Sequence, residues 1–168
     1  KLNILLKFPL EAKVFFIDIN SENNIINQSL IGYIMKTNYV VGFAFNKEKT
    51  KLLLIKKTKP EWQAGLLNGI GGKIEDYDST PYHAMTREFF EESNIKTVKE
   101  SWYEFAKLDS PYFELHCFVG FFDENYLETF ENVTEEEIFF VDVQDLFNQQ
   151  FSGCISNLKW LISMCLDE

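Results

Sequence analysis

The chain has 168 residues, 46% of them hydrophobic and 25% charged, and its formal net charge is -10. This length and composition predict one globular domain that buries a full core. The acidic balance argues against a broad basic surface for extended DNA or RNA, so an anionic ligand needs a local cation. Cys117, Cys154 and Cys165 lack the paired spacing of a zinc site, and they favour a reducing cytoplasm.

Residues 1–38 are expected to form an N-terminal extension ahead of the main domain. Lys7, Glu11 and Lys13 interrupt its apolar runs, so the segment has neither signal-peptide nor membrane-spanning form, and no membrane association is expected. Residues 13–19, KVFFIDI, are rich in β-branched and aromatic types and predict one strand. This strand pairs within its own sheet or with another subunit, and the second arrangement would make a homodimer.

Two apolar runs of strand length, residues 39–45 and 51–57, open the main domain, which spans 39–168. The segment after them carries four glycines between positions 65 and 72. Glycine permits tight turns and lets the backbone approach a ligand closely. The sequence therefore predicts a functional loop here.

A helix is predicted over residues 81–93. Thr80 offers an N-cap oxygen, and the proline that follows fits the first helical position. At about 100° per residue, one face of this helix carries Glu88, Glu91 and Glu92, and an apolar stripe lies beside it. One side of the helix should pack against the core while the other presents carboxylates.

Three further strands are predicted at residues 102–108, 112–122 and 137–143, and a final amphipathic helix at 155–166. Strands that mix with helices at different points of the chain predict a layered α/β fold rather than a helical bundle or a β-sandwich.

The clustered glutamates of the first helix have two interpretations. Like charges at helical spacing destabilise a helix by a few tenths of a kcal/mol per pair, so they need a compensating feature. A charge run by itself is typical of a solvated face. Next to a glycine-rich loop, however, such carboxylates are the oxygen ligands that Mg²⁺ prefers, and the metal would supply the missing local cation.

Two neighbouring segments resemble the Nudix box, G-x5-E-x7-R-E-U-x-E-E-x-G-U, in which U is aliphatic or aromatic. They are residues 72–78, GKIEDYD, and residues 87–95, REFFEESNI. The resemblance extends to the upstream strands and to residues 137–146, and it covers most of 39–166. It implies a Nudix-type α/β/α sandwich with a mixed β-sheet between helices.

The sequence departs from this pattern at three places. Asp78 stands where the box has its first glutamate, and eight rather than seven residues separate it from Arg87. The extra residue falls in a loop, where insertions cost little, and it can offset the shorter side chain. Asn94 replaces the last glycine, and asparagine is well suited to the left-handed conformation that ends a helix.

The resemblance implies hydrolysis of a nucleoside diphosphate linked to another group, with Mg²⁺ or Mn²⁺ as cofactor. By position, it assigns the metal ligands as the Gly71 carbonyl, Glu88, Glu92 and, directly or through water, Glu91. It also assigns Glu91 a part in catalysis, and it makes Arg87 the anchor of the glycine-rich loop, with Asp78 or Glu75 as partner.

Glu137 resembles the distal glutamate that many family members bring to the metal site, and we take it as the candidate general base. Glu135 and Glu136 compete for the same role, because a shift of register by one or two residues exchanges them. A solvated turn is the alternative interpretation of all three residues.

The order W-x-x-G-x-x-N-G-x-G-G-K resembles the MutT-like branch, which hydrolyses nucleoside triphosphates, including oxidised purine ones. Asn68, Lys73 and Phe151 are the substrate-binding candidates, with Asn68 at the base-contacting position and Phe151 where an aromatic ring stacks on the base. A turn residue and a core residue are the alternatives for Asn68 and Phe151. Gly153 and Cys154 replace an acidic pair found in some relatives, which weakens the case for 8-oxo-purines.

Other substrates stay open. Pro111 and Tyr112 lie where ADP-ribose and dinucleoside-polyphosphate branches carry marker residues, although both also suit a turn. A domain that senses a nucleotide without cleaving it is the second class of function. The intact glutamates argue against that class, because binding alone needs no metal that activates water.

Overall fold

The computed structural model describes residues 36–148 and 153–167. The strand expected at residues 13–19 and the candidate residue Phe151 lie outside this part of the chain. The strands are β1 (Thr37–Asn46), β2 (Lys51–Lys56), β3 (Leu67–Asn68), β4 (Tyr103–Asp109), β5 (Phe113–Phe122) and β6 (Glu137–Asp142). The helices are α1 (Pro81–Ser93), α2 (Glu124–Leu127), α3 (Val143–Phe147) and α4 (Leu158–Leu166), with 3-10 turns at Glu61–Gln63 and Lys99–Ser101.

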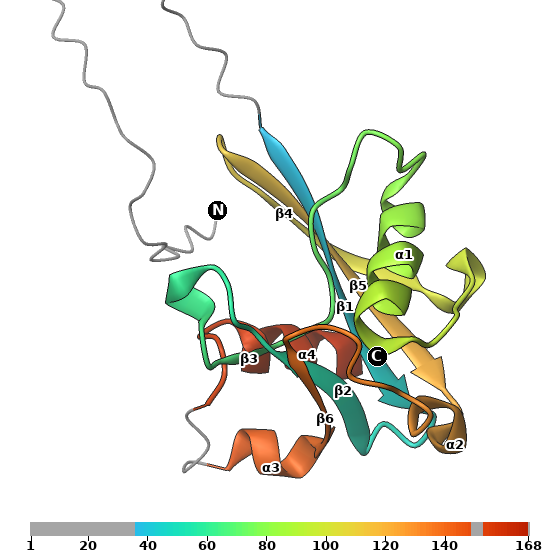
Figure 1. Cartoon of the computed structure of the whole chain (residues 1–168). Helices are drawn as coiled ribbons and strands as arrows, with labels where there is room; N and C mark the ends of the chain where they lie inside the picture. The colour runs from blue at the N-terminus through green and yellow to red at the C-terminus, as the bar shows by residue number, and fades with distance from the viewer. Residues whose placement is uncertain (1–35, 149–152, 168) are drawn as a thin grey trace, which may run out of the picture. The chain divides into compact units, whose positions relative to one another are not determined.

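The strands form one six-stranded mixed sheet (Figure 1). Its order is β3-β2-β1-β5-β4, and β6 also pairs with β2. β1 and β5 run parallel over ten residue pairs, whereas the other strand pairs are antiparallel. The predicted α/β fold with a mixed β-sheet is therefore confirmed.

β1 and β2 pair over a short stretch and then diverge, and the glycine-rich loop lies in the fork between them. These two strands pair at Ala44 with Leu53 and at Phe45 with Leu52. Farther along, β3 takes the place beside β2, and Ile70 pairs with Gly42 of β1. The loop is thus held in the sheet by backbone hydrogen bonds.

Helices cover both faces of the sheet. Along β2, Leu53 and Ile55 contribute to a core with α1, whereas Leu52 and Leu54 contribute to a second core with α3 and α4. This alternation follows from the period of two residues in a strand. Figure 1 shows α1 and α4 on opposite sides of the sheet, so the predicted α/β/α sandwich is confirmed.

The ends of α1 follow the sequence signals. The Thr80 hydroxyl accepts a hydrogen bond from the His83 N–H, and Pro81 is the first helical residue. Asn94 ends the helix with φ 59°, in the left-handed region, as its place in the box predicts. Two short helices, α2 and α3, were not predicted, and α4 begins at Leu158 rather than at residue 155.

Cys117, Cys154 and Cys165 are free thiols. Across the described ranges, no helix has both the length and the apolar character that a membrane span requires.

Candidate active site

The guanidinium of Arg87 holds the carboxylate of Asp78 at two points. Arg87 Nε donates to Asp78 Oδ1 at 3.0 Å, and Nη2 donates to Oδ2 at 2.8 Å. The Asp78 side chain is fully buried, and it accepts a further hydrogen bond from the backbone N–H of Glu75 at 2.9 Å. Of the two partners predicted for Arg87, Asp78 is therefore the one that forms the ion pair. Glu75 supports this pair through its backbone N–H, which donates to Asp78.

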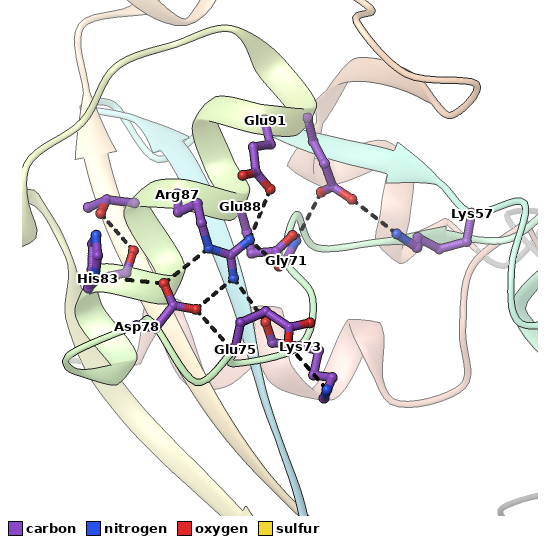
Figure 2. Close-up of polar contacts among 11 residues, drawn as sticks. Lys57, Gly71, Lys73, Glu75, Asp78, His83, Arg87, Glu88 and Glu91 are labelled. Carbon is purple, nitrogen blue, oxygen red and sulfur yellow. Dashed lines mark hydrogen bonds and ion pairs between the residues drawn. The ribbon is translucent and has the colours of Figure 1, made fainter.

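Arg87 also links this loop to the glutamates of α1 (Figure 2). Its Nη1 donates to Glu88 at 2.8 Å and to Glu91 at 2.9 Å, and its Nη2 donates to the Lys73 carbonyl at 3.0 Å. The hydrogen bonds from Arg87 lower the pKa of Asp78, and Asp78 in turn raises the pKa of Arg87, so both groups stay charged. The buried Arg87 side chain thus holds the glycine-rich loop together with Glu88 and Glu91 of α1.

Glu88 and Glu92 converge on two adjacent residues of the glycine-rich loop. The Gly71 N–H donates to Glu92 Oε2 at 3.1 Å. A Cβ atom at Gly72 would lie 2.5 Å from Glu88 Oε2, so the Glu88 carboxylate occupies the space that the missing side chain leaves. A Cβ at Gly71 would meet the Val40 carbonyl oxygen at 2.2 Å. Glycine is therefore required at Gly71, where the neighbour is backbone, whereas a side chain at Gly72 would have to displace the Glu88 carboxylate.

Burial sets the protonation of these carboxyl groups. The side chains of Glu88 and Glu92 are 14% and 11% exposed, whereas that of Glu91 is 53% exposed. Burial raises the pKa of Glu92 to about 7 and outweighs the opposing effect of Lys57. Burial also raises the pKa of Glu88, against the hydrogen bond from Arg87. A cation of higher charge beside Glu88 and Glu92 would stabilise the ionised form of both carboxyl groups.

Lys57 joins Glu92 to Glu136. Its Nζ lies 3.2 Å from Glu92 Oε1 and also donates to Glu136, whose second oxygen accepts from the Thr58 N–H at 2.6 Å. Lys57 was not singled out from the sequence. It follows Leu53 and Ile55 at alternate positions on the α1 side of β2, but the sequence does not say which face of the strand meets α1.

Glu136 and Glu137 lie toward opposite faces of the sheet. Ile138, two residues after Glu136, packs in the core with α1. Glu137 is 63% exposed and lies 3.9 Å from Lys56, which neighbours Lys57 on the other face. Of these two candidates for the distal carboxylate, Glu136 is the one that the structure brings to Glu92, and Glu137 is not at this cluster.

The substrate-binding candidates have other contacts in this structure. Asn68 donates to Gln63 at 3.1 Å and accepts from the Gly69 N–H at 2.7 Å, so its amide links two parts of the loop. Lys73 is exposed, with its Nζ 3.2 Å from Glu75. Asn68 therefore stabilises a turn as well as lying next to the glycines, and Lys73 contributes its carbonyl to Arg87.

The donor set fits a hard divalent cation. Among residues 36–148 and 153–167, no three acidic, histidine or cysteine side chains are already arranged around a metal position. Arg87 and Lys57 hold the glutamates instead. Two buried carboxylates that meet at the same loop backbone nevertheless provide the oxygen chemistry that Mg²⁺ and Mn²⁺ prefer. Mg²⁺ held by a few carboxylates is typical of proteins that bind substrate phosphates.

Comparison with known proteins agrees with this class. The model of the Nudix domain family matches residues 35–161. A structure of MutT, from a study of Aliivibrio salmonicida and Vibrio cholerae, is 20% identical, has a TM-score of 0.58, and covers 78% of this chain and 98% of its own. A Nudix family hydrolase from Clostridium perfringens is 17% identical, with a TM-score of 0.60, and covers 79% of this chain and 97% of its own.

The Nudix domain of Shewanella oneidensis NrtR, in complex with ADP ribose, is 12% identical and has a TM-score of 0.58. It covers 78% of this chain and 86% of its own. No curated protein matches the chain significantly in sequence. At such low identities, the structural likeness shows a shared fold.

Because the family model matches most of the chain, this protein belongs to the Nudix family. It is a Nudix pyrophosphohydrolase, and the family relation supports a nucleotide-linked substrate.

Proposed function

We propose that the protein hydrolyses a nucleoside triphosphate to a monophosphate and pyrophosphate, with Mg²⁺ or Mn²⁺ as cofactor. The observation that carries this proposal is the convergence of Glu88 and Glu92 on Gly71 and Gly72. The family resemblance of the loop and the fold shared with MutT support the triphosphate branch. In this proposal residues 39–168 form the catalytic domain, and residues 1–38 are an extension available for contact with a second subunit.

In the proposed mechanism, Glu88, Glu92 and the Gly71 carbonyl would hold the metal, and Glu91 would add a direct or water-mediated ligand. The bound metal supplies neutralisation of phosphate oxygens and a water of lowered pKa. Arg87 positions these groups, because its bonds to Asp78 and to the Lys73 carbonyl fix the loop against α1. We assign Arg87 this positioning role.

We propose Glu136 as the distal carboxylate, in place of Glu137. Burial alone would raise the pKa of Glu136, but hydrogen bonds from Lys57 and from Thr58 outweigh it, and the pKa is lowered. Glu136 is therefore ionised at neutral pH and able to accept a hydrogen bond from water. Its side chain is 12% exposed and directed to the same lysine as Glu92.

For recognition of the base, we propose the loop around Asn68 together with Phe151. The Asn68 amide is already ordered by Gln63 and Gly69, so it presents a fixed edge beside the glycine-rich loop. An aromatic ring stacked on a base contributes about 1 to 3 kcal/mol by analogy with nucleic-acid systems.

A second candidate function is hydrolysis or sensing of an ADP-ribose-like or dinucleoside-polyphosphate ligand. The specific observation in its favour is the shared fold with the NrtR Nudix domain that binds ADP ribose. The glutamates Glu88, Glu91 and Glu92 favour cleavage over sensing, because a ligand can be bound without a metal that activates water.

Product analysis separates these candidates. The full chain is incubated with Mg²⁺ and a panel of canonical and oxidised nucleoside triphosphates, dinucleoside polyphosphates and ADP-ribose, and the products are resolved by chromatography. Monophosphate and pyrophosphate from a triphosphate support the proposal. If only ADP-ribose or only a dinucleoside polyphosphate is cleaved, that compound replaces the nucleoside triphosphate as the proposed substrate. Tight calorimetric binding of one compound that is recovered unchanged supports a sensor.

A further inference from the structure

Lys57 is a buried cation held between two carboxylates from different elements. Its side chain is 15% exposed, and those of Glu92 and Glu136 are 11% and 12% exposed. Glu92 belongs to α1, Lys57 directly follows β2, and Glu136 directly precedes β6. The Lys57 ammonium group therefore links α1 to the ends of β2 and β6.

The position of the ammonium is fixed by the backbone around it. β2 and β6 pair in register, with Lys56 opposite Glu137. Glu136 also accepts from the Thr58 N–H and, at 3.2 Å, from the Thr58 hydroxyl. Because Glu136 is held by the chain next to Lys57, the lysine has a defined partner on one side and Glu92 on the other.

The two oxygens of Glu92 are divided between the loop and this lysine. Oε2 accepts from the Gly71 N–H at 3.1 Å, and Oε1 faces Lys57 Nζ at 3.2 Å. Oε1 is thus the oxygen turned away from the loop backbone. A divalent cation that binds Glu92 through Oε1 competes with the ammonium group for the same atom.

We propose that Lys57 is a built-in counter-cation that holds Glu92 in place before metal binds, and that it sets the metal affinity of the site. To bind Glu92 Oε1, a metal ion would have to displace the Lys57 ammonium group from this oxygen. This inference rests on the proposed metal-dependent function. Burial would lower the pKa of Lys57, but Glu92 and Glu136 outweigh it and raise the pKa, which keeps the competitor charged. Lys57 is a positioning residue, acting through Glu92.

Lys56 provides a matched control. It is adjacent in sequence, is the last residue of β2, and lies 3.9 Å from Glu137 on the opposite face of the sheet. Its side chain is 47% exposed, so its charge is screened by solvent. Removing Lys56 changes the net charge by the same amount as removing Lys57, without touching Glu92.

The test measures Mn²⁺ binding to the full chain at pH 8, with the electron paramagnetic resonance signal of free Mn²⁺ as the readout. The proteins compared are wild type, Lys57→Met, Lys57→Arg and Lys56→Met. Lys57→Met is expected to bind Mn²⁺ about fivefold more tightly than wild type, because the competing charge is gone. Lys57→Arg, which keeps the charge, and Lys56→Met are expected to stay within twofold of wild type.

A second measurement uses the wild-type chain in case Lys57→Met does not fold. Lysine methylation is followed by mass spectrometry with and without Mn²⁺. Displacement of Lys57 predicts a several-fold rise of its labelling with Mn²⁺ and no change at Lys56. Equal Mn²⁺ affinity in wild type and Lys57→Met, or unchanged labelling of Lys57, overturns the inference and leaves the proposed function standing. Failure of wild type to bind Mn²⁺ at all overturns both.

Discussion

Asp78 accepts hydrogen bonds from Arg87 at both of its carboxylate oxygens, at 3.0 and 2.8 Å. The aspartate is one methylene shorter than the glutamate of the Nudix box, and the loop before α1 is one residue longer. In this chain the shorter side chain still reaches the arginine, and the Glu75 N–H adds a third contact to the same carboxylate. The altered box therefore retains the ion pair that anchors the loop.

Replacing Asp78 by Asn should destabilise the protein by about 3 kcal/mol, because Arg87 would remain buried without its main anionic partner. The free energy of unfolding is measured by urea denaturation. Asp76→Asn, two residues away and exposed, is the control and should change the free energy by less than about 0.5 kcal/mol. Equal stabilities of the two variants would show that the ion pair does not anchor the loop.

Glu92 should make the metal-free protein less stable as the pH rises. Its pKa is raised from 4.5 to about 7 by burial, so between these values the folded state holds a proton that the unfolded state has released. The stabilisation is fully present below pH 4.5 and is lost as the pH rises through about 7, a change of about 3 kcal/mol. Urea unfolding with a chelator present, from pH 4.5 to 8, measures this change.

Glu92→Gln is the reference for that measurement, since it removes the titrating group and keeps the shape. Wild type should lose stability relative to Glu92→Gln as the pH rises. If the two stability curves stay parallel across the range, the carboxyl group does not titrate as its burial predicts.

Gly72→Ala should reduce metal-dependent turnover by about 10- to 100-fold. The added Cβ would lie 2.5 Å from Glu88 Oε2, so either the carboxylate or the loop must shift. Steady-state kinetics at saturating Mg²⁺ measures the loss. Gly153→Ala is the control, because a Cβ there meets no atom within 4 Å. Full activity in Gly72→Ala would mean that the position of Glu88 is not critical.

Glu136 and Glu137 give a paired test of the distal carboxylate. Glu136→Gln should lower kcat by at least about 100-fold if this group takes part in proton transfer, whereas Glu137→Gln should stay within about twofold. The reason is the alternation of β6, which places Glu136 with Lys57 and Glu137 with the exposed Lys56. The reverse order of effects would restore Glu137 as the distal residue. Circular dichroism checks that both variants are folded.

Local sequence signals predicted α1 well. Thr80, the proline after it and Asn94 act through their immediate neighbours, so both ends of the helix could be placed without knowledge of the tertiary structure. The helix α3, of five residues, is too short to show helical periodicity. β3 has two residues and exists only because it pairs with β2 across the fork, which no local pattern records.

The candidate site was predictable in part for the same reason. Arg87, Glu88 and Glu92 belong to one helix, and their relative positions follow from its period. Lys57 and Glu136 meet only because β2 and β6 pair in one register and turn the same face toward α1. A shift of one residue would exchange Glu136 for Glu137, and sequence alone does not fix that register.

The most direct test of the account is the chromatographic yield of monophosphate and pyrophosphate from a nucleoside triphosphate, with Mg²⁺ and with a chelator, for wild type and Glu92→Gln. Wild type is expected to give equal amounts of both products only when Mg²⁺ is present, and a folded Glu92→Gln protein is expected to lose at least about 100-fold of this yield. Turnover by Glu92→Gln at the wild-type rate would contradict the assignment of the catalytic site to this face of α1.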